Sequence, residues 1–396
     1  MSAAVPASLS SEANEEEKKG LEPILSQAVK ALRQYGEEGK EGEEGGGGSG
    51  GSKVVDDWIE RNKASRILLD DLAERVKKNL RDPRIDRELE KGRLLASLAS
   101  TISRSSSSID QLCKVKKEDY DAHKMISWGR LRLSCFTLLA HLVSSEKRCL
   151  LILPTVVDPM LDMLRSASAK TDFAGVRIAC NIVRNLSLSR ANHQGLWRKG
   201  TFEAILKHAD HKDPNTSLAA AICARQLSRQ CEDYVANDAP PSFETVTENL
   251  SRILKKDMKH VHPIVRVELS RAFASLLVSC AASRKCFEAR NPEDMPTTAP
   301  WTKKVKPALL ILTSHDSLEF ICFLLASNAP PLHAEALAAL KTAFLENTAD
   351  AKMQRTDENF LSFLATMRVA VNDVEMTVRE RFEGIQKLQK AAMGGR

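Results

Sequence analysis

Aromatic residues are scarce in this sequence, at 5% of its 396 residues. Many β-sheet proteins draw heavily on aromatic and β-branched side chains, whereas Leu, Ala, Ser and Arg are abundant here. Leu, Ala and Arg are good helix formers. Because 43% of the residues are hydrophobic, the chain can bury a substantial core. The composition therefore predicts an all-α fold.

Long apolar runs and paired cysteines are also absent. No apolar run approaches the roughly 20 residues that span a bilayer, and the N-terminus lacks the basic and apolar regions of a secretory signal. The nine cysteines include no CxxC pair, which is typical of small buried thiols in a reducing compartment. We therefore expect a soluble, cytoplasmic protein without a transmembrane segment.

Motifs for catalysis and metal binding are missing as well. The sequence contains no Gly-rich phosphate loop that opens a helix and no G-x-S-x-G elbow. The pairs His208/His211 and His260/His262 lack Cys or carboxylate partners at zinc-site spacing, so we interpret them as surface residues. A Cys–His pair that meets only in the folded chain stays open. We predict no enzyme activity, no catalytic residue, no metal and no cofactor.

Charge is distributed unevenly along the chain. Residues 1–52 contain ten Glu against five Lys or Arg, a balance of −5, so the remaining residues carry +11 of the total of +6. A basic body can attract nucleic acid, acidic lipid or an acidic protein patch. Because no nucleic-acid-binding motif accompanies this charge, we expect a protein partner and neither nucleic acid nor a small-molecule substrate.

Residues 1–52 differ from the rest in composition and are expected to form a disordered acidic and Gly-rich arm. Residues 21–35 predict a short amphipathic helix within this arm. The tether EEGKEGEEGGGGSGGS, residues 37–52, follows it. The short helix either frays or docks on the chain or on a partner, and both possibilities stay open. Residues 53–396 are expected to form the helical domain.

A helical pattern recurs along that domain. Its template places five residues at i, i+3, i+4, i+7 and i+10: Val176, Ala179, Cys180, Val183 and Leu186. Equivalent copies end at Leu98, Leu142, Leu227, Leu276 and Ala343. The anchors are spaced 44, 44, 41, 49 and 67 residues apart, and the central spacings suit stacked helical repeats. A Pro-rich insertion near 289–307 lies within the longest spacing.

Residues 179–208 resemble a known family. Arg184-Asn185-Leu186 ends one helix, and Asn192, Leu196 and Gly200 follow with the spacing of a junction between armadillo repeats. In that junction a glycine permits a tight bend at positive φ. The resemblance implies an all-α, armadillo/HEAT-like α-solenoid, a superhelix of stacked repeats that binds a protein partner in its concave groove.

The same resemblance suggests which residues line the groove. In armadillo proteins the asparagine of the third helix lies there, and Asn185 matches it. The residue before each anchor is polar in all six copies: Ser97, His141, Asn185, Gln226, Ser275 and Thr342. Stacked helices would align these positions in a polar stripe. The candidate partner-binding residues are His141, Asn181, Arg184, Asn185, Arg225, Gln226, Arg271 and Ser275.

Residues 176–188, the NHQGLWRKG turn and HAEALAALKTAF at 333–344 are also similar to the GDP-dissociation stimulators of small GTPases. Members of that family bind GTPases that carry a basic, prenylated tail. The resemblance implies a guanyl-nucleotide exchange factor or chaperone. The positive charges of Arg184, Arg225 and Arg271 do not suit the binding of a basic tail. The alternative is a general scaffold or adaptor for cargo, chaperone or cytoskeletal partners.

Two further features have two interpretations each. Trp197 is either an exposed binding anchor, since Trp is frequent among interface hot spots, or a buried cap between two repeats. The serine run at 103–108 is either a phosphorylated loop near Arg104 or a polar linker.

Overall fold

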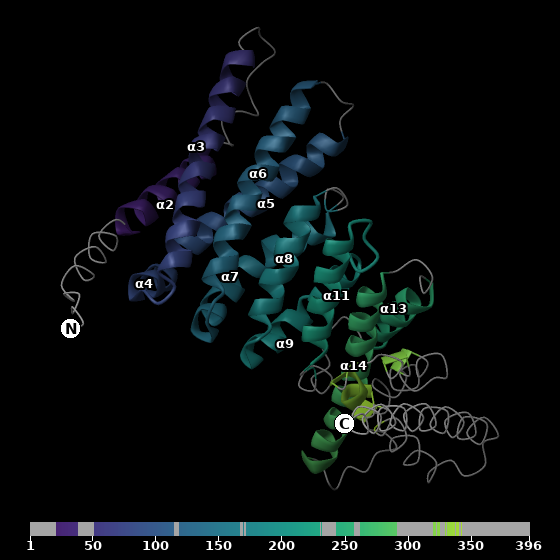
Figure 1. Cartoon of the computed structure of the whole chain (residues 1–396). Coiled ribbons are helices and arrows are strands. Elements are labelled where there is room, and N and C mark those ends of the chain that lie inside the picture. The colour runs from purple at the N-terminus through teal and green to yellow at the C-terminus, as the bar shows by residue number, and fades with distance from the viewer. Residues whose placement is uncertain are drawn as a thin grey trace, which may run out of the picture. The chain divides into compact units, whose positions relative to one another are not determined.

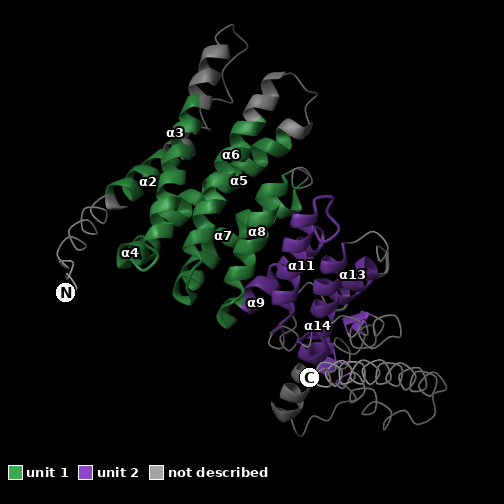
Figure 2. Cartoon of the chain, viewed as in Figure 1, with its two compact units in different colours: residues 1–192 green, residues 193–396 purple. Residues whose placement is uncertain are grey.

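The computed structural model is helical, and the residues that it describes contain no strand. These are residues 21–38, 51–114, 119–166, 169, 172–229, 231, 243–256 and 262–290, with residues 320, 321, 323, 324, 329, 331–336, 338, 339 and 342. Figure 1 shows the arrangement of the labelled helices, and Figure 2 shows two compact units, residues 1–192 in green and residues 193–396 in purple. Each unit is described separately below.

The first unit consists of two rows of helices that pack side by side. One row contains α3 (Gly51–Lys78), α6 (Asp119–Leu142) and α8 (Phe173–Leu186). The other contains α2 (Leu21–Glu38), α5 (Arg93–Lys114) and α7 (Glu146–Arg165), and the short α4 (Pro83–Lys91) packs against α5 and α7. Consecutive members of each row are in contact, and α2, α5 and α7 pack across to α3, α6 and α8. Such layers are the architecture of an α-solenoid.

The second unit follows the same plan of two rows. Helices α11 (Pro214–Ser228) and α14 (Pro263–Arg290) pack together as one row, and α10 (Thr201–Leu206) packs against α13 (Phe243–Lys256) as the other. Helices α10 and α13 also contact α11 and α14 respectively. Helix α9 (Arg190–Arg198) spans the boundary between the units. The predicted all-α, armadillo/HEAT-like solenoid fold is confirmed.

The register of the repeat pattern agrees with burial. All five template positions on α8 are fully buried, and the equivalent positions on α6 and α11 are buried as well. On α14, Leu269, Ser270, Phe273 and Leu276 are buried, while Arg266 is half-buried with its guanidinium 3.9 Å from the centre of the Phe323 ring. One face of each of these helices therefore supplies the core between layers.

Polar contacts in the first unit connect residues about one repeat apart. The Arg132 guanidinium donates to Asp172, 40 residues further along the chain. The Ser189 hydroxyl donates to Glu146, 43 residues earlier, and the Cys149 thiol donates to the backbone oxygen of Asn185, 36 residues later. Because each repeat in a solenoid touches mainly its neighbours, separations of this size are expected.

The copy of the pattern that ends at Leu98 was assigned to the wrong row. Leu98 lies near the start of α5, which packs between α2 and α7, whereas α3 is the helix that precedes α6 in its row. Ser97 is consequently buried, and its hydroxyl donates to the backbone oxygen of Arg93 at 2.9 Å. It does not belong to a stripe with His141 and Asn185, the polar positions on α6 and α8.

The serine run at 103–108 is neither a loop nor a linker, because it lies inside α5. Ser105 and Ser106 are buried, and each hydroxyl donates to the backbone oxygen of Ile102, at 2.8 and 2.9 Å. A serine hydroxyl that bonds to a carbonyl one turn earlier can be buried in a helix. The turn propensity of serine is overridden here by that local hydrogen bond.

The amphipathic helix expected at 21–35 is α2, and it packs against α3 and α5. Leu25, Ala28 and Leu32 on its apolar face are buried. Both ends of the proposed tether are helical, since α2 extends to Glu38 and α3 begins at Gly51. Residues 39–50 lie outside the described residues, as do residues 291–307 of the proposed insertion and the last repeat anchor.

Gly200 makes the bend that the sequence predicts. Its φ of 67° is in the left-handed region, which favours glycine because it has no Cβ. The Gly200 backbone N–H donates to the oxygen of Trp197 at 3.0 Å, and α10 begins at the next residue.

Among the described helices, none combines the length and apolar character needed to cross a membrane.

Candidate functional site

The candidate residues of the first unit lie on α6 and α8, which are neighbours in one row. His141, Asn181, Arg184 and Asn185 are all half-buried, opposite helix faces that are fully buried. On α8, Asn181 and Asn185 are four residues apart and so share one helix face. We call His141, Asn181, Arg184 and Asn185 the α6–α8 strip.

His141 lies at the end of α6, the helix that packs against α3. Partial burial lowers the pKa of His141, and the nearby Lys77 lowers it further, whereas Glu74 acts in the opposite direction. The imidazole is therefore biased toward its neutral form, which offers one hydrogen-bond donor and one acceptor. A neutral histidine can contact an uncharged peptide group.

The α8 part of this strip has few partners within the protein. Arg184 Nη2 donates to Asn185 Oδ1 at 3.4 Å, a long hydrogen bond. Within the described part of the chain, Asn181 makes no side-chain hydrogen bond, although its amide has two donor hydrogens and an acceptor oxygen. Its amide therefore has hydrogen-bonding capacity for a ligand.

The candidate residues of the second unit lie on α11 and α14. Arg225, Gln226, Arg271 and Ser275 are half-buried, like their counterparts in the first unit. We call these four residues the α11–α14 strip. Its two arginines, unlike Asn181, are bound to other side chains of the protein.

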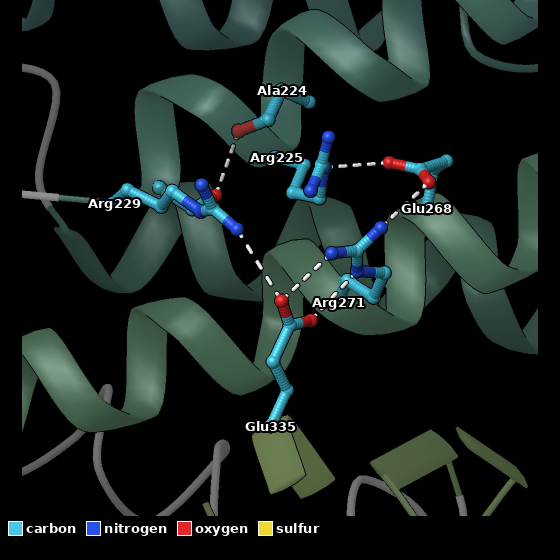
Figure 3. Close-up of polar contacts among 7 residues, drawn as sticks. Ala224, Arg225, Arg229, Glu268, Arg271 and Glu335 are labelled. Carbon is cyan, nitrogen blue, oxygen red and sulfur yellow. Dashed lines mark hydrogen bonds and ion pairs between the residues drawn. The ribbon is translucent and has the colours of Figure 1, made fainter. Parts of the chain in front are cut away.

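Figure 3 shows the ion pairs of these arginines. Arg271 Nε and Nη2 donate to the two carboxylate oxygens of Glu335 at 2.6 and 2.7 Å, and Arg271 Nη1 donates to Glu268 at 3.0 Å. Arg225 Nε lies 2.6 Å from Glu268 Oε2, but their orientation does not make an aligned hydrogen bond. Arg229 Nη2 donates to Glu335 Oε1 at 3.3 Å. We call these five residues the α11–α14 charge cluster.

Charge and burial oppose each other in this cluster. Hydrogen bonding to Arg271 lowers the pKa of Glu335, and the same contact raises the pKa of Arg271. Burial lowers the pKa of Arg225, and Arg271 and Arg229 add to that effect while Glu268 opposes it. Glu335 thus stabilises a group of guanidiniums that would otherwise repel one another.

Sequence reasoning found Arg225 and Arg271 of this cluster but missed Arg229 and both glutamates. Glu268 precedes Arg271 by three residues in α14, so helical i, i+3 spacing could have identified that pair. Glu335 is 64 residues from Arg271 and 106 from Arg229. No local sequence signal connects residues at such separations.

Two buried arginines of the first unit form ion pairs away from the candidate strips. Arg132, which occupies a core position on α6, bonds to Asp172 at 2.6 Å and to the Ser106 hydroxyl at 3.1 Å. Arg148 on α7 bonds to Asp86 on α4 at 2.5 Å. A buried charge needs a paired and hydrogen-bonded partner, so these contacts constrain how neighbouring helices pack.

Trp197 is buried, which confirms that it caps the junction between repeats. Its ring stacks on Phe202 with centroids 4.9 Å apart, and its indole N–H donates to the backbone oxygen of Leu227 at 3.0 Å. It is therefore not an exposed binding anchor.

The histidine pair at 208 and 211 differs from the sequence interpretation, because His208 is buried. The two rings lie 6.3 Å apart. His262 is exposed, and His260 lies outside the described residues. Among the residues with a described position, no three His, Cys, Asp or Glu side chains form a group that could hold a metal ion.

A separate cavity of about 280 Å³ lies between α10 and α13 in the second unit. Its walls carry side chains of both charges and a few aliphatic groups: Glu203, Leu206, Lys207, Asp210, Asn249, Arg252 and Ile253. It contains none of the candidate residues.

Comparison with known proteins gives structural likeness only. No protein-family model matches the sequence, and no curated protein matches it. A designed armadillo repeat protein shares 13% identity and covers 66% of this chain and 99% of its own, with a TM-score of 0.38. A computationally designed armadillo repeat protein for modular peptide recognition also shares 13% identity and covers 66% and 98%, with a TM-score of 0.36. An engineered protein with 14% identity covers 89% and 99%, with a TM-score of 0.35.

Proposed function

We propose that this protein binds extended segments of partner proteins along the α6–α8 and α11–α14 strips. The observation that carries the proposal is the division of α8 into two faces. One face is fully buried in the core, while Asn181, Arg184 and Asn185 stay half-buried, and the side-chain contact described among them is the long Arg184–Asn185 hydrogen bond. Half-buried amides at helical spacing can pair with the backbone N–H and C=O groups of an extended chain.

Aliphatic residues that precede the polar ones on the same helices add apolar contacts to this proposal. Leu133 on α6 and Ile178 on α8 are half-buried, as are Leu218 on α11 and Val267 on α14. Each helix thus presents an aliphatic residue followed by polar residues. An apolar pocket with a few polar groups is the usual composition of a binding surface.

Substitution of the two asparagines tests the proposal. Each lost amide contact costs about 0.5–1.5 kcal/mol, so Asn181→Ala with Asn185→Ala is expected to weaken partner binding roughly 5- to 150-fold. The matched control is Gln194→Ala, which removes a half-buried amide from α9. Affinity purification with quantitative mass spectrometry compares the variants. Partners that are retained equally by all three proteins would contradict the proposal.

A narrower form of the proposal is that the partner is a small GTPase and that the protein acts as an exchange factor or chaperone. The resemblance at 176–188 and 333–344 supports it. Glu268 and Glu335 also place carboxylates beside Arg225 and Arg271, so the α11–α14 strip is less basic than its sequence suggested. Exchange needs no catalytic residue if the solenoid binds the nucleotide-free GTPase more tightly.

Pull-down with a panel of GTPases, with and without nucleotide, tests this narrower role. Preferential capture of an empty GTPase is the expected result. Equal capture of loaded and empty forms would rule out exchange and leave a general scaffold or adaptor as the alternative.

The adaptor alternative included recruitment through the N-terminal helix. Because the apolar face of α2 is buried against α3 and α5, such a partner would contact its exposed side. Gln27→Glu with Lys30→Glu changes exposed residues only and is therefore a sharper test than deletion of residues 1–52. Loss of a partner from this variant, with an unchanged melting temperature, would favour recruitment through α2.

A further inference from the structure

The α11–α14 charge cluster contains three arginines and two glutamates: Arg225, Arg229, Arg271, Glu268 and Glu335. Four of these residues belong to or directly follow the helices α11 and α14. Glu335 alone comes from a different segment, the helical turn at 331–336. Without it, three guanidiniums would share one carboxylate.

Glu335 is held as an external carboxylate ligand would be. Arg271 donates bidentate hydrogen bonds to both carboxylate oxygens of Glu335, at 2.6 and 2.7 Å, and Arg229 donates a third hydrogen bond at 3.3 Å. Planar guanidinium groups favour this bidentate recognition of carboxylates. The geometry would serve equally well for the side chain of a glutamate on another chain.

Solvent reaches the cluster from the side of Glu335. Its side chain is 29% exposed and that of Arg229 is 44% exposed, whereas the Glu268 side chain is 12% exposed. Glu335 is therefore the more accessible of the two carboxylates. Gln226 and Ser275, the polar residues of the α11–α14 strip, adjoin Arg225 and Arg271 in sequence or by one helical turn and are also half-buried.

We propose that the α11–α14 charge cluster is a recognition site for an acidic segment of a partner protein, and that Glu335 occupies it as an internal ligand which the partner's carboxylate displaces. This inference rests on the proposed function and names the partner chemistry of one strip. A partner must compete with Glu335. The apparent affinity is therefore the intrinsic affinity multiplied by the fraction of molecules in which Glu335 has left the site.

Fluorescence polarisation with a labelled (Ser-Glu)4 peptide tests the inference, and the same label on (Ser-Gln)4 provides the uncharged comparison. Glu335→Ala removes the internal competitor and is expected to tighten binding of (Ser-Glu)4 roughly tenfold, within the range of ordinary coupling between sites. Arg271→Ala removes the bidentate contact and is expected to weaken binding at least about tenfold.

Matched controls separate recognition from general charge attraction. Glu248→Ala changes the net charge as Glu335→Ala does, and Arg198→Ala changes it as Arg271→Ala does; both residues are exposed and lie in the second unit. Neither control is expected to change the affinity more than about twofold, because exposed charges are screened by salt beyond about 10 Å at 0.1 M.

Glu335→Gln keeps the shape of the side chain and provides a second variant in case Glu335→Ala disturbs the fold. Circular dichroism melting verifies that each variant is folded. Tighter binding of (Ser-Glu)4 by folded Glu335→Gln supports the inference. Unchanged or weaker binding by folded Glu335 variants would show that Glu335 is a structural latch and would overturn it.

Equal binding of (Ser-Gln)4 and (Ser-Glu)4, or full affinity in Arg271→Ala, would also overturn the inference. Neither result affects the test of the first unit, in which Asn181→Ala with Asn185→Ala is compared with Gln194→Ala. The two experiments can therefore fail independently.

Discussion

Gly175, on the first turn of α8, is the position where a single methyl group has the most informative effect. A Cβ added there would lie 2.7 Å from Asp172 Cγ and closer still to its Oδ2. Asp172 caps α8 by accepting from the Gly175 backbone N–H at 2.9 Å, and it also pairs with the buried Arg132. Gly175→Ala must therefore push this carboxylate away from both partners.

The expected loss can be estimated from the three terms involved. Alanine is favoured over glycine inside a helix by about 1 kcal/mol, and loss of the cap costs about 1 kcal/mol. Separating a buried ion pair costs about 3–5 kcal/mol, and the lower end applies because the Asp172 side chain is 23% exposed. The sum is a destabilisation of about 3 kcal/mol. In a unit of this size that lowers the melting temperature by roughly 6–12 °C.

Gly129 on α6 provides the matched control, because an added Cβ there meets nothing within 4 Å. Gly129→Ala is expected to stabilise the protein by up to about 1 kcal/mol. Calorimetry of the full chain would compare the melting of both alanine variants with that of the unchanged protein. Gly175→Ala would then be measured again in a protein that also carries Asp172→Ala. In that background the obstacle is gone, so Gly175→Ala should be neutral or stabilising. If Gly175→Ala still cost about 3 kcal/mol there, the carboxylate would not be the cause and the reasoning would be refuted.

Other predictions concern single side chains. Trp197→Ala is expected to lower the free energy of unfolding by about 3–5 kcal/mol, because the ring is buried on Phe202; a loss below about 1 kcal/mol in urea denaturation would contradict its role as a cap. Burial raises the pKa of Cys135 and of Cys180 to about 12, so alkylation mapped by mass spectrometry should spare both thiols at pH 8 until the protein unfolds. His141 should titrate below its usual pKa of 6.5 in an NMR experiment. As the pH falls, His141 is protonated in the unfolded chain before it is protonated in the folded protein. Neutral His141 therefore contributes to stability above pH 6.5, and this contribution is lost as the pH falls through the lowered pKa of the folded protein. A folded pKa at or above 6.5 would contradict this prediction.

The sequence was sufficient for the fold and, within each unit, for the helices that carry the candidate residues. Apolar spacing within Val176–Leu188 identified the buried face of α8, and Gly200 identified the bend before α10. Two errors arose where periodicity alone is ambiguous. Leu98 fits the repeat spacing but belongs to α5 in the other row, because a single spacing cannot distinguish the two helices of one layer. The serine run has the composition of a loop or linker, and composition does not reveal hydroxyl bonding to Ile102 inside a helix.

The electrostatics of the site could not be derived from sequence for a different reason. Arg271 and Arg225 were identified, but the state of their charges depends on Glu335, and folding brings that residue to them across 64 positions in the case of Arg271. Arg132 similarly occupies a slot that is apolar in α8, and only its contact with Asp172 explains its burial. The pairs Arg271–Glu335 and Arg132–Asp172 connect different helices, so their partners lie 64 and 40 residues away along the chain.

The two strips therefore differ in a way that matters for function. In the first unit, Asn181 and Asn185 are half-buried, and the one described hydrogen bond between their side chains and another side chain is the long contact from Arg184. A ligand that binds Asn181 competes with no side-chain hydrogen bond among the described residues. In the second unit, Glu335 already occupies Arg271, so on the proposal above the affinity for a ligand depends on how firmly the turn at 331–336 is held. If the proposals above hold, the same helical position gives one surface that is ready for a partner and another whose binding depends on the release of Glu335. Partner binding measured on variants of one strip consequently does not predict the behaviour of the other.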